Sequence, residues 1–125
     1  MRLLLDSNAY IWAIMRPSEL SDAARQAIED AENQRFVSVA CLWELAIKSA
    51  AGKLDLPDNY TDGVDHIAAT LLQIDIPHLK RLQSLPRHHR DPFDRMMIAQ
   101  ALEENLTIVT RDRAFRAYGV PLLAA

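Results

Sequence analysis

The stretch RLLLDSNAYIW, residues 2–12, decides the fold of this chain. It begins with the apolar run Arg2–Leu5, which has no polar preface and is typical of a β-strand buried on both faces. A helical pattern follows over residues 8–15, after a single acid, Asp6. The sequence therefore predicts a central buried strand that ends at a carboxylate and is followed by a helix.

Short apolar runs and helical patterns alternate along the rest of the chain. Further strands are expected at residues 35–38, 72–76, 107–109 and 121–123. Further helices are expected at residues 20–32, 39–51, 60–71, 78–84, 92–104 and 112–117, with start signals at Ser21-Asp22, Ser38 and Asp91-Pro92 and stop signals at Gly52 and Gly119. This alternation implies an α/β protein with a parallel sheet and helices on both faces.

The composition bounds the class of protein. A chain of 125 residues, half of them apolar, has the usual size of one domain, and we expect a single domain over residues 1–125. Cys41 is the only cysteine, and no segment has the pattern of a secretion signal or a membrane span. We therefore expect a cytoplasmic protein without membrane contact. Trp12 and Trp43 stand among aliphatic residues and are expected in the core.

The charge is unevenly distributed. The net charge of −3 argues against a protein that coats nucleic acid, yet residues 63–125 carry 8 Lys and Arg against 7 Asp and Glu, whereas residues 1–62 carry 6 against 10. A local basic surface would explain this bias, and so would an ordinary solvated face. The arginines that would contact RNA on such a surface are Arg87, Arg90, Arg95, Arg111 and Arg113.

Two acids follow predicted strands directly or closely. Asp6 ends the first strand, and Asp112 comes soon after the strand at residues 107–109. In an open parallel sheet, ligands bind beyond the carboxyl ends of the strands, at the point where the strand order reverses. Each acid also has a simpler explanation as the N-cap of the next helix, and one residue can do both.

Glu44 is the only acid in the helix predicted at residues 39–51, which is otherwise apolar apart from Lys48. A helix that is apolar on all sides is buried on most of them. Glu44 therefore either reaches a polar cleft or turns to solvent and pairs with Lys48 four residues later. The sequence alone leaves both explanations open.

The segment Asp91-Pro92-Phe93-Asp94 gives the sharpest local argument. Pro92 suits the first position of a helix, which makes Asp91 the N-cap and places Asp94 in the first turn. The offsets of three, four, seven and eight residues from Asp94 all reach apolar residues, so this acid heads the stripe that faces the core. Asp91 is thus explained as a cap, whereas Asp94 points inward and needs a partner.

Buried carboxylates that converge on one pocket repel each other and would take up protons. A hard divalent cation removes both penalties, and we therefore predict a Mg²⁺ or Mn²⁺ site formed by Asp6, Glu44, Asp94 and Asp112, with Asp91 as an additional candidate. The four histidines lack the spacing of zinc ligands. No glycine-rich phosphate-binding motif and no acyl-transfer triad is recognisable.

The sequence resembles the PIN-domain ribonucleases, and specifically the VapC-type toxins of type II toxin–antitoxin systems. The segments that carry the resemblance are LLLDSNAYIW (3–12), SVACLWELAIK (38–48), LPRHHRDPFDRMMIAQA (85–101), IVTRDRAF (108–115) and YGVPLL (118–123). They occur in order and cover nearly the whole chain. One departure is visible, because close relatives usually have Thr-His after the first Asp, where this chain has Ser7-Asn8.

The resemblance implies a three-layer α/β/α sandwich with a five-stranded parallel sheet. It maps the metal-binding acids of the family onto Asp6, Glu44, Asp94 and Asp112, and gives Ser7, Asn8 and Thr110 supporting roles. It further implies a homodimer that is inhibited by a VapB-type antitoxin. The reaction would be hydrolysis of RNA phosphodiester bonds with one or two metal ions that activate water, which leaves a 5′-phosphate.

Two other classes of protein fit parts of the pattern. A catalytically idle PIN-like module would bind RNA or protein without cutting it. A phosphoryl-receiver signalling domain has a similar length and an acidic Mg²⁺ pocket, but it requires adjacent acids after the first strand and a Lys after the fifth. Here Asp6 is followed by Ser7, and the chain after Leu123 contains only alanines.

Overall fold

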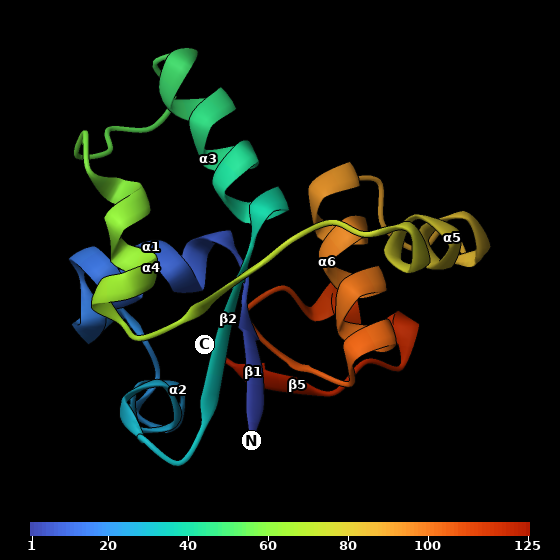
Figure 1. Cartoon of the computed structure of the whole chain (residues 1–125), viewed down its shortest axis with the longest axis horizontal. Helices are drawn as coiled ribbons and strands as arrows, with labels where there is room; N and C mark the ends of the chain where they lie inside the picture. Colours follow the sequence, from blue (N-terminus) through green and yellow to red (C-terminus); the bar gives the residue numbers. More distant parts are fainter.

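A five-stranded, all-parallel sheet forms the centre of the protein (Figure 1). The computed structural model describes residues 1–125. The strands are β1 (Arg2–Leu5), β2 (Gln34–Ser38), β3 (Thr70–Leu72), β4 (Thr107–Thr110) and β5 (Leu122–Ala124), in the spatial order β3-β2-β1-β4-β5. Strand β1 is central, as expected. The order reverses beside it, because the chain adds β2 and β3 on one side and β4 and β5 on the other.

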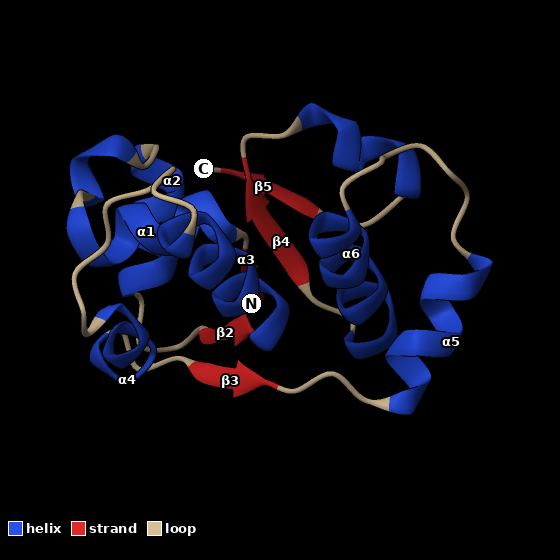
Figure 2. Ribbon diagram, turned by 90° about the horizontal axis from the view of Figure 1, so that it is seen from above, coloured by secondary structure: helices blue, strands red, loops and turns tan.

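Helices cover both faces of this sheet. They are α1 (Ser7–Met15), α2 (Asp22–Glu29), α3 (Val39–Ala50), α4 (Gly63–His66), α5 (Ile76–Ser84) and α6 (Pro92–Glu104), with short 3₁₀ helices η1 (Pro17–Glu19), η2 (Tyr60–Asp62) and η3 (Arg113–Tyr118). Helices α1 and α2 lie on one side of the sheet, and α6 lies on the other with α5 beside it (Figures 1 and 2). The predicted α/β/α sandwich with a parallel sheet is confirmed.

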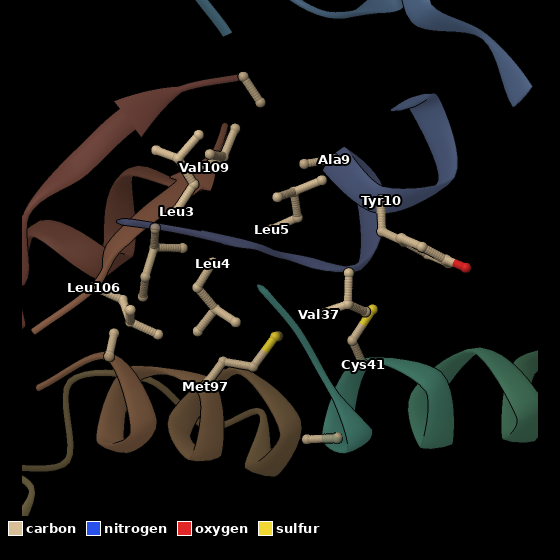
Figure 3. Packing of buried hydrophobic residues seen from close by; sticks show 14 of the residues in the cluster. Leu3, Leu4, Leu5, Ala9, Tyr10, Val37, Cys41, Met97, Leu106 and Val109 are labelled. Carbon is tan, nitrogen blue, oxygen red and sulfur yellow. The ribbon is translucent and has the colours of Figure 1, made fainter. Parts of the chain in front are cut away.

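Strand β1 joins the two halves of the core. Leu3, Leu4 and Leu5 are fully buried. Successive side chains point to opposite faces, so Leu4 points toward Met97 of α6, whereas Leu5 points toward Ala9 of α1 (Figure 3). This burial explains why the run has no polar residue, and it fixes the position of Asp6 at the end of the strand.

The third strand and the helix before it were predicted wrongly. The strand is Thr70–Leu72, not 72–76, and the expected helix at 60–71 is only η2 followed by α4, which ends before Ala68 at a left-handed backbone angle (φ 54°). The cause is a cap. Asp75 is the N-cap residue of α5, and its backbone N–H donates to Nδ1 of His78 at 3.0 Å, so the helix begins at Ile76 and excludes a strand there.

Trp43 also differs from the expectation, because its side chain is 56% exposed on α3 and packs edge-on against Phe93. Trp12 is partly buried, with the guanidinium of Arg111 over its ring at 4.1 Å. No helix of the protein combines the length and the apolar character needed to cross a bilayer. The strand order also differs from the 2-1-3-4-5 order of receiver-like domains, which removes that alternative.

Candidate metal centre

The four predicted metal-binding acids come together at the carboxyl edge of the sheet. Asp6 follows β1 and Asp112 follows β4, the two neighbouring strands at the reversal of the strand order. Helices α3 and α6 bring Glu44 and Asp94 to the same place. The resulting cleft has a volume of about 160 Å³ and is lined only by polar residues: Asp6, Ser7, Asn8, Glu44, Lys48, Asp91, Asp94, Arg111 and Asp112.

Asp6 caps α1 and also borders the cleft, so the two explanations that the sequence left open are compatible. Its Oδ1 accepts a hydrogen bond from the backbone N–H of Ala9 at 2.9 Å and caps α1, while the side chain borders the cleft. Burial raises the pKa of Asp6, although hydrogen bonds from Thr110 and Ala9 act in the other direction. Asp6 is therefore held in place from two sides and still carries a desolvation cost when it is ionised.

Glu44 also combines its two alternatives. Its Oε1 accepts a hydrogen bond from Ser7 Oγ at 2.5 Å inside the cleft, and its Oε2 lies 3.1 Å from Lys48 Nζ. The carboxylate is buried, whereas the side chain of Lys48 is half exposed. Ser7 thus holds the carboxylate of Glu44 in position, which is the kind of supporting role expected for it.

Asp94 is an inward-facing acid of the cluster with a raised pKa. Asp91 caps α6 as expected, because its Oδ1 accepts from the backbone N–H groups of Phe93 (2.8 Å) and Asp94 (3.2 Å). The side chain of Asp94 points inward and is only 20% exposed. Burial, with the charges of Asp91 and Glu44 as further causes, raises the pKa of Asp94 to about 7. A bound cation would reverse this effect.

Asp112 is the most exposed of the four acids and the best satisfied. Its Oδ1 accepts from the backbone N–H of Ala114 at 2.9 Å and caps η3, and its Oδ2 lies 2.9 Å from Nε2 of His89. Burial acts to raise the pKa of Asp112, but the hydrogen bonds from His89 and Ala114 outweigh it and lower that pKa. Thr110 Oγ1 accepts from the backbone N–H of Asp112 at 3.0 Å, so Thr110 links the ends of β1 and β4.

His89 is the site residue that the sequence interpretation missed. Its Nε2 lies between Asp112 Oδ2 (2.9 Å) and Asp94 Oδ2 (3.3 Å). The histidines lack zinc spacing, and the sequence assigned His88 and His89 to the candidate basic surface rather than to the acidic cleft. The signal available was the short distance along the chain, since His89 stands two residues before the cap Asp91 and five before Asp94.

The arginines predicted to contact RNA fall into two groups. Arg95 is used within the fold, because it donates to Pro86 O at 2.9 Å. Arg111 stacks on Trp12 and donates to Ala125 O at 3.1 Å, yet it borders the acidic cleft. Arg87, Arg90 and Arg113 are exposed, and their contact with RNA stays a prediction. A second cavity of about 650 Å³, lined by Arg111, Asp112, Arg113 and Arg116 among others, runs beside the edge strand β5.

The donor set fits a hard divalent cation. Carboxylate oxygens dominate the cleft, two of its acids have raised pKa values, and the only nearby cationic side chain paired with a site acid is Lys48. No sulfur ligand, which would favour softer metals, lines the cleft. The one imidazole close to its acids is that of His89, whose ring lies beside Asp94 and Asp112.

Comparison with known proteins agrees with the fold. Residues 3–121 match the PIN domain family, and the chain belongs to that family. It is 30% identical to Ribonuclease VapC22 of Mycobacterium tuberculosis, over 95% of this chain and 93% of the relative. The predicted family is thereby confirmed, and PIN-domain nucleases generally use divalent metal ions.

Solved structures with the same fold come from complexes. VapBC2 of Rickettsia felis, bound to a DNA fragment from its promoter, has a TM-score of 0.75 at 18% identity and covers 98% of both chains. DNA-bound VapBC of Salmonella typhimurium has a TM-score of 0.71 at 19% identity, with coverage of 98% and 97%. FitAcB of Neisseria gonorrhoeae has a TM-score of 0.61 at 22% identity, with coverage of 98% and 96%.

Proposed function

We propose that the protein is a Mg²⁺- or Mn²⁺-dependent ribonuclease that acts as the toxin of a VapBC-type toxin–antitoxin pair. The observation that carries this proposal is the polar cleft in which four carboxylates from four different elements meet, with the pKa of Asp94 raised to about 7. Such an arrangement is costly unless a cation occupies it, and membership of the PIN domain family supplies the reaction class.

Asp6, Glu44, Asp94 and Asp112 would hold one or two ions, some of them through water. A bound ion would supply an activated water and neutralise charge that develops on the scissile phosphate and the leaving oxygen. The chain's own groups prepare the site. Ser7 and Lys48 orient Glu44, and Asp94 gives up its proton when the cation arrives.

The RNA backbone would enter along the basic cavity beside β5, because that cavity and the acidic cleft share Arg111 and Asp112. Arg111 is held in place by Trp12 and Ala125, so its charge is already oriented before a phosphate binds. Attack in line with the 3′-oxygen would leave a 5′-phosphate. We propose as well that residues 1–125 form one domain, that the protein dimerises, and that a VapB-type antitoxin inhibits it.

Incubation of the purified protein with total RNA, in Mg²⁺ or in EDTA, tests the proposal. Cleavage should require the metal and should be lost in Asp6→Asn and Asp94→Asn, while Asp58→Asn, an exposed acid in the loop before η2, should keep it. Expression in a host should arrest growth only with the wild-type acids. Metal-independent RNA binding without cleavage would instead support the idle PIN-like module.

A further inference from the structure

His89 stands in the loop between α5 and α6 and is fixed from several directions. Its backbone N–H donates to Tyr118 Oη at 2.8 Å, and its ring packs edge-on against Phe115 with centroids 5.7 Å apart. The side chain is 15% exposed. Both aromatic partners belong to η3, the element that Asp112 caps, so the loop and the end of β4 are held as one unit.

The hydrogen bonds of the ring define its tautomer. The backbone N–H of Asp91 donates to Nδ1 of His89 at 3.0 Å, so Nδ1 is the acceptor and the proton of the neutral ring is on Nε2. This proton faces Asp112 Oδ2 at 2.9 Å and Asp94 Oδ2 at 3.3 Å. With its proton on Nε2, the ring has no lone pair to offer a metal in the cleft, and it acts as a donor to two carboxylates.

We propose that His89 is a positioning residue which holds Asp94 and Asp112 together, by one Nε2–H shared between them, at the spacing that a divalent cation requires. The inference deepens the proposed function and rests on it for the identity of the cation. Each carboxylate oxygen can accept more than one bond, so Asp112 Oδ2 keeps a lone pair for a metal while it accepts from His89. Donors of this kind orient carboxylate ligands in metal sites.

Two substitutions distinguish a residue that positions the two carboxylates from one that only anchors the loop. His89→Asn keeps an acceptor near the position of Nδ1 for the Asp91 N–H, but it is too short to reach the carboxylates. His89→Gln places an amide N–H near the position of Nε2 and restores a donor. His88→Asn is the matched control, because the neighbouring His88 is exposed and packs on Tyr118 rather than on an acid of the cleft.

The test is the dissociation constant for Mn²⁺ in the absence of RNA, measured by calorimetry on each full-length variant, together with the midpoint of thermal unfolding in EDTA. We expect His89→Asn to weaken Mn²⁺ binding about 10- to 100-fold, His89→Gln to recover most of that loss, and His88→Asn to bind as the wild type does. The midpoint of thermal unfolding in EDTA shows whether each variant folds. If His89→Asn does not fold, the comparison of Mn²⁺ binding between the wild type and His89→Gln still tests the role.

Unchanged Mn²⁺ binding in His89→Asn would overturn the inference, and so would an equal loss in His89→Gln, which would mark His89 as an anchor of the loop. The proposed function fails differently, since a wild-type protein that binds Mn²⁺ but leaves RNA intact refutes the ribonuclease and leaves the role of His89 standing. A wild type that cuts RNA while His89→Asn binds Mn²⁺ normally refutes only the role of His89.

Discussion

Asp94→Asn is expected to stabilise the metal-free protein while it removes metal binding. In the folded chain, the pKa of Asp94 is raised from the ordinary 3.8 to about 7, with burial as the main cause. At about 1.4 kcal/mol for each tenfold change in proton affinity, this difference corresponds to about 4 kcal/mol. Because neighbouring acids share the titration, we expect about 2 to 4 kcal/mol to be recovered when the charge is removed.

The direction of the pH dependence follows from the same pKa. Between pH 3.8 and about 7 the folded state binds more protons at Asp94 than the unfolded state does, so the free energy of unfolding falls as the pH rises through this range. Above pH 7 Asp94 is ionised in both states, and the loss of stability reaches its full value. The gain in stability from Asp94→Asn should therefore be largest near pH 8. It should shrink toward pH 4, where Asp94 in the folded wild type is protonated and thus neutral, as the amide of the variant is.

Urea unfolding in EDTA, at several pH values, measures this difference. The neutral amide still offers an oxygen to His89, so the hydrogen bond to the ring need not be lost. Asp58→Asn, on an exposed loop, should change stability by less than about 0.5 kcal/mol. With Mn²⁺ at 100 times its dissociation constant, the wild type should gain about 2.7 kcal/mol, whereas Asp94→Asn should gain far less. A variant that is less stable than the wild type at pH 8 in EDTA would refute the reasoning.

Three further changes test other parts of the structure. Leu4→Ala removes a fully buried side chain from β1 and should lower the free energy of unfolding by about 2 to 5 kcal/mol in urea titrations, so a loss below 1 kcal/mol would contradict the packing. Asp91→Ala should lower the free energy of unfolding by about 0.5 to 2 kcal/mol, because the α6 cap is lost. Asp91→Asn should keep both the cap and RNA cleavage, so an inactive Asp91→Asn would show that Asp91 does more than cap the helix. Arg111→Gln should weaken RNA binding and reduce the slope of log affinity against log salt by about 1, and an unchanged slope would exclude a phosphate contact.

The positions of Asp6 and Asp94 were predictable because each has a local signal that survives folding, whereas Glu44 and Asp112 were assigned through the family resemblance. Asp94 lies at the head of an apolar helical stripe, and Asp6 ends a buried strand, and both patterns depend on residues close in the sequence. Local signals misled where two explanations overlapped. The run at residues 72–76 is apolar enough for a strand, but Asp75 and Pro77 start a helix within it, and the cap decided the outcome.

Only a weak signal in the sequence indicated His89, its short distance from Asp91 and Asp94, because its other partners are distant along the chain. Asp91 and Asp94 are close, but Asp112, Phe115 and Tyr118 come from an element more than 20 residues later. For Trp43 the local pattern was clear but misleading, because an apolar helix predicts a buried side chain. Helix α3 projects beyond the sheet edge (Figure 1), so one side of this helix has no layer to cover it.

Helix N-termini make the gathering of acids tolerable before any cation binds. Asp6, Asp91 and Asp112 cap α1, α6 and η3, so each carboxylate accepts backbone N–H groups, and the partial positive charge of the long helices favours it further. Asp94 stands in the first turn of α6, but its side chain is committed to no backbone N–H and is buried beside Asp91. Ionisation of Asp94 is therefore costly without a cation and would be favoured by one, so Asp94 couples metal binding to the stability of the fold.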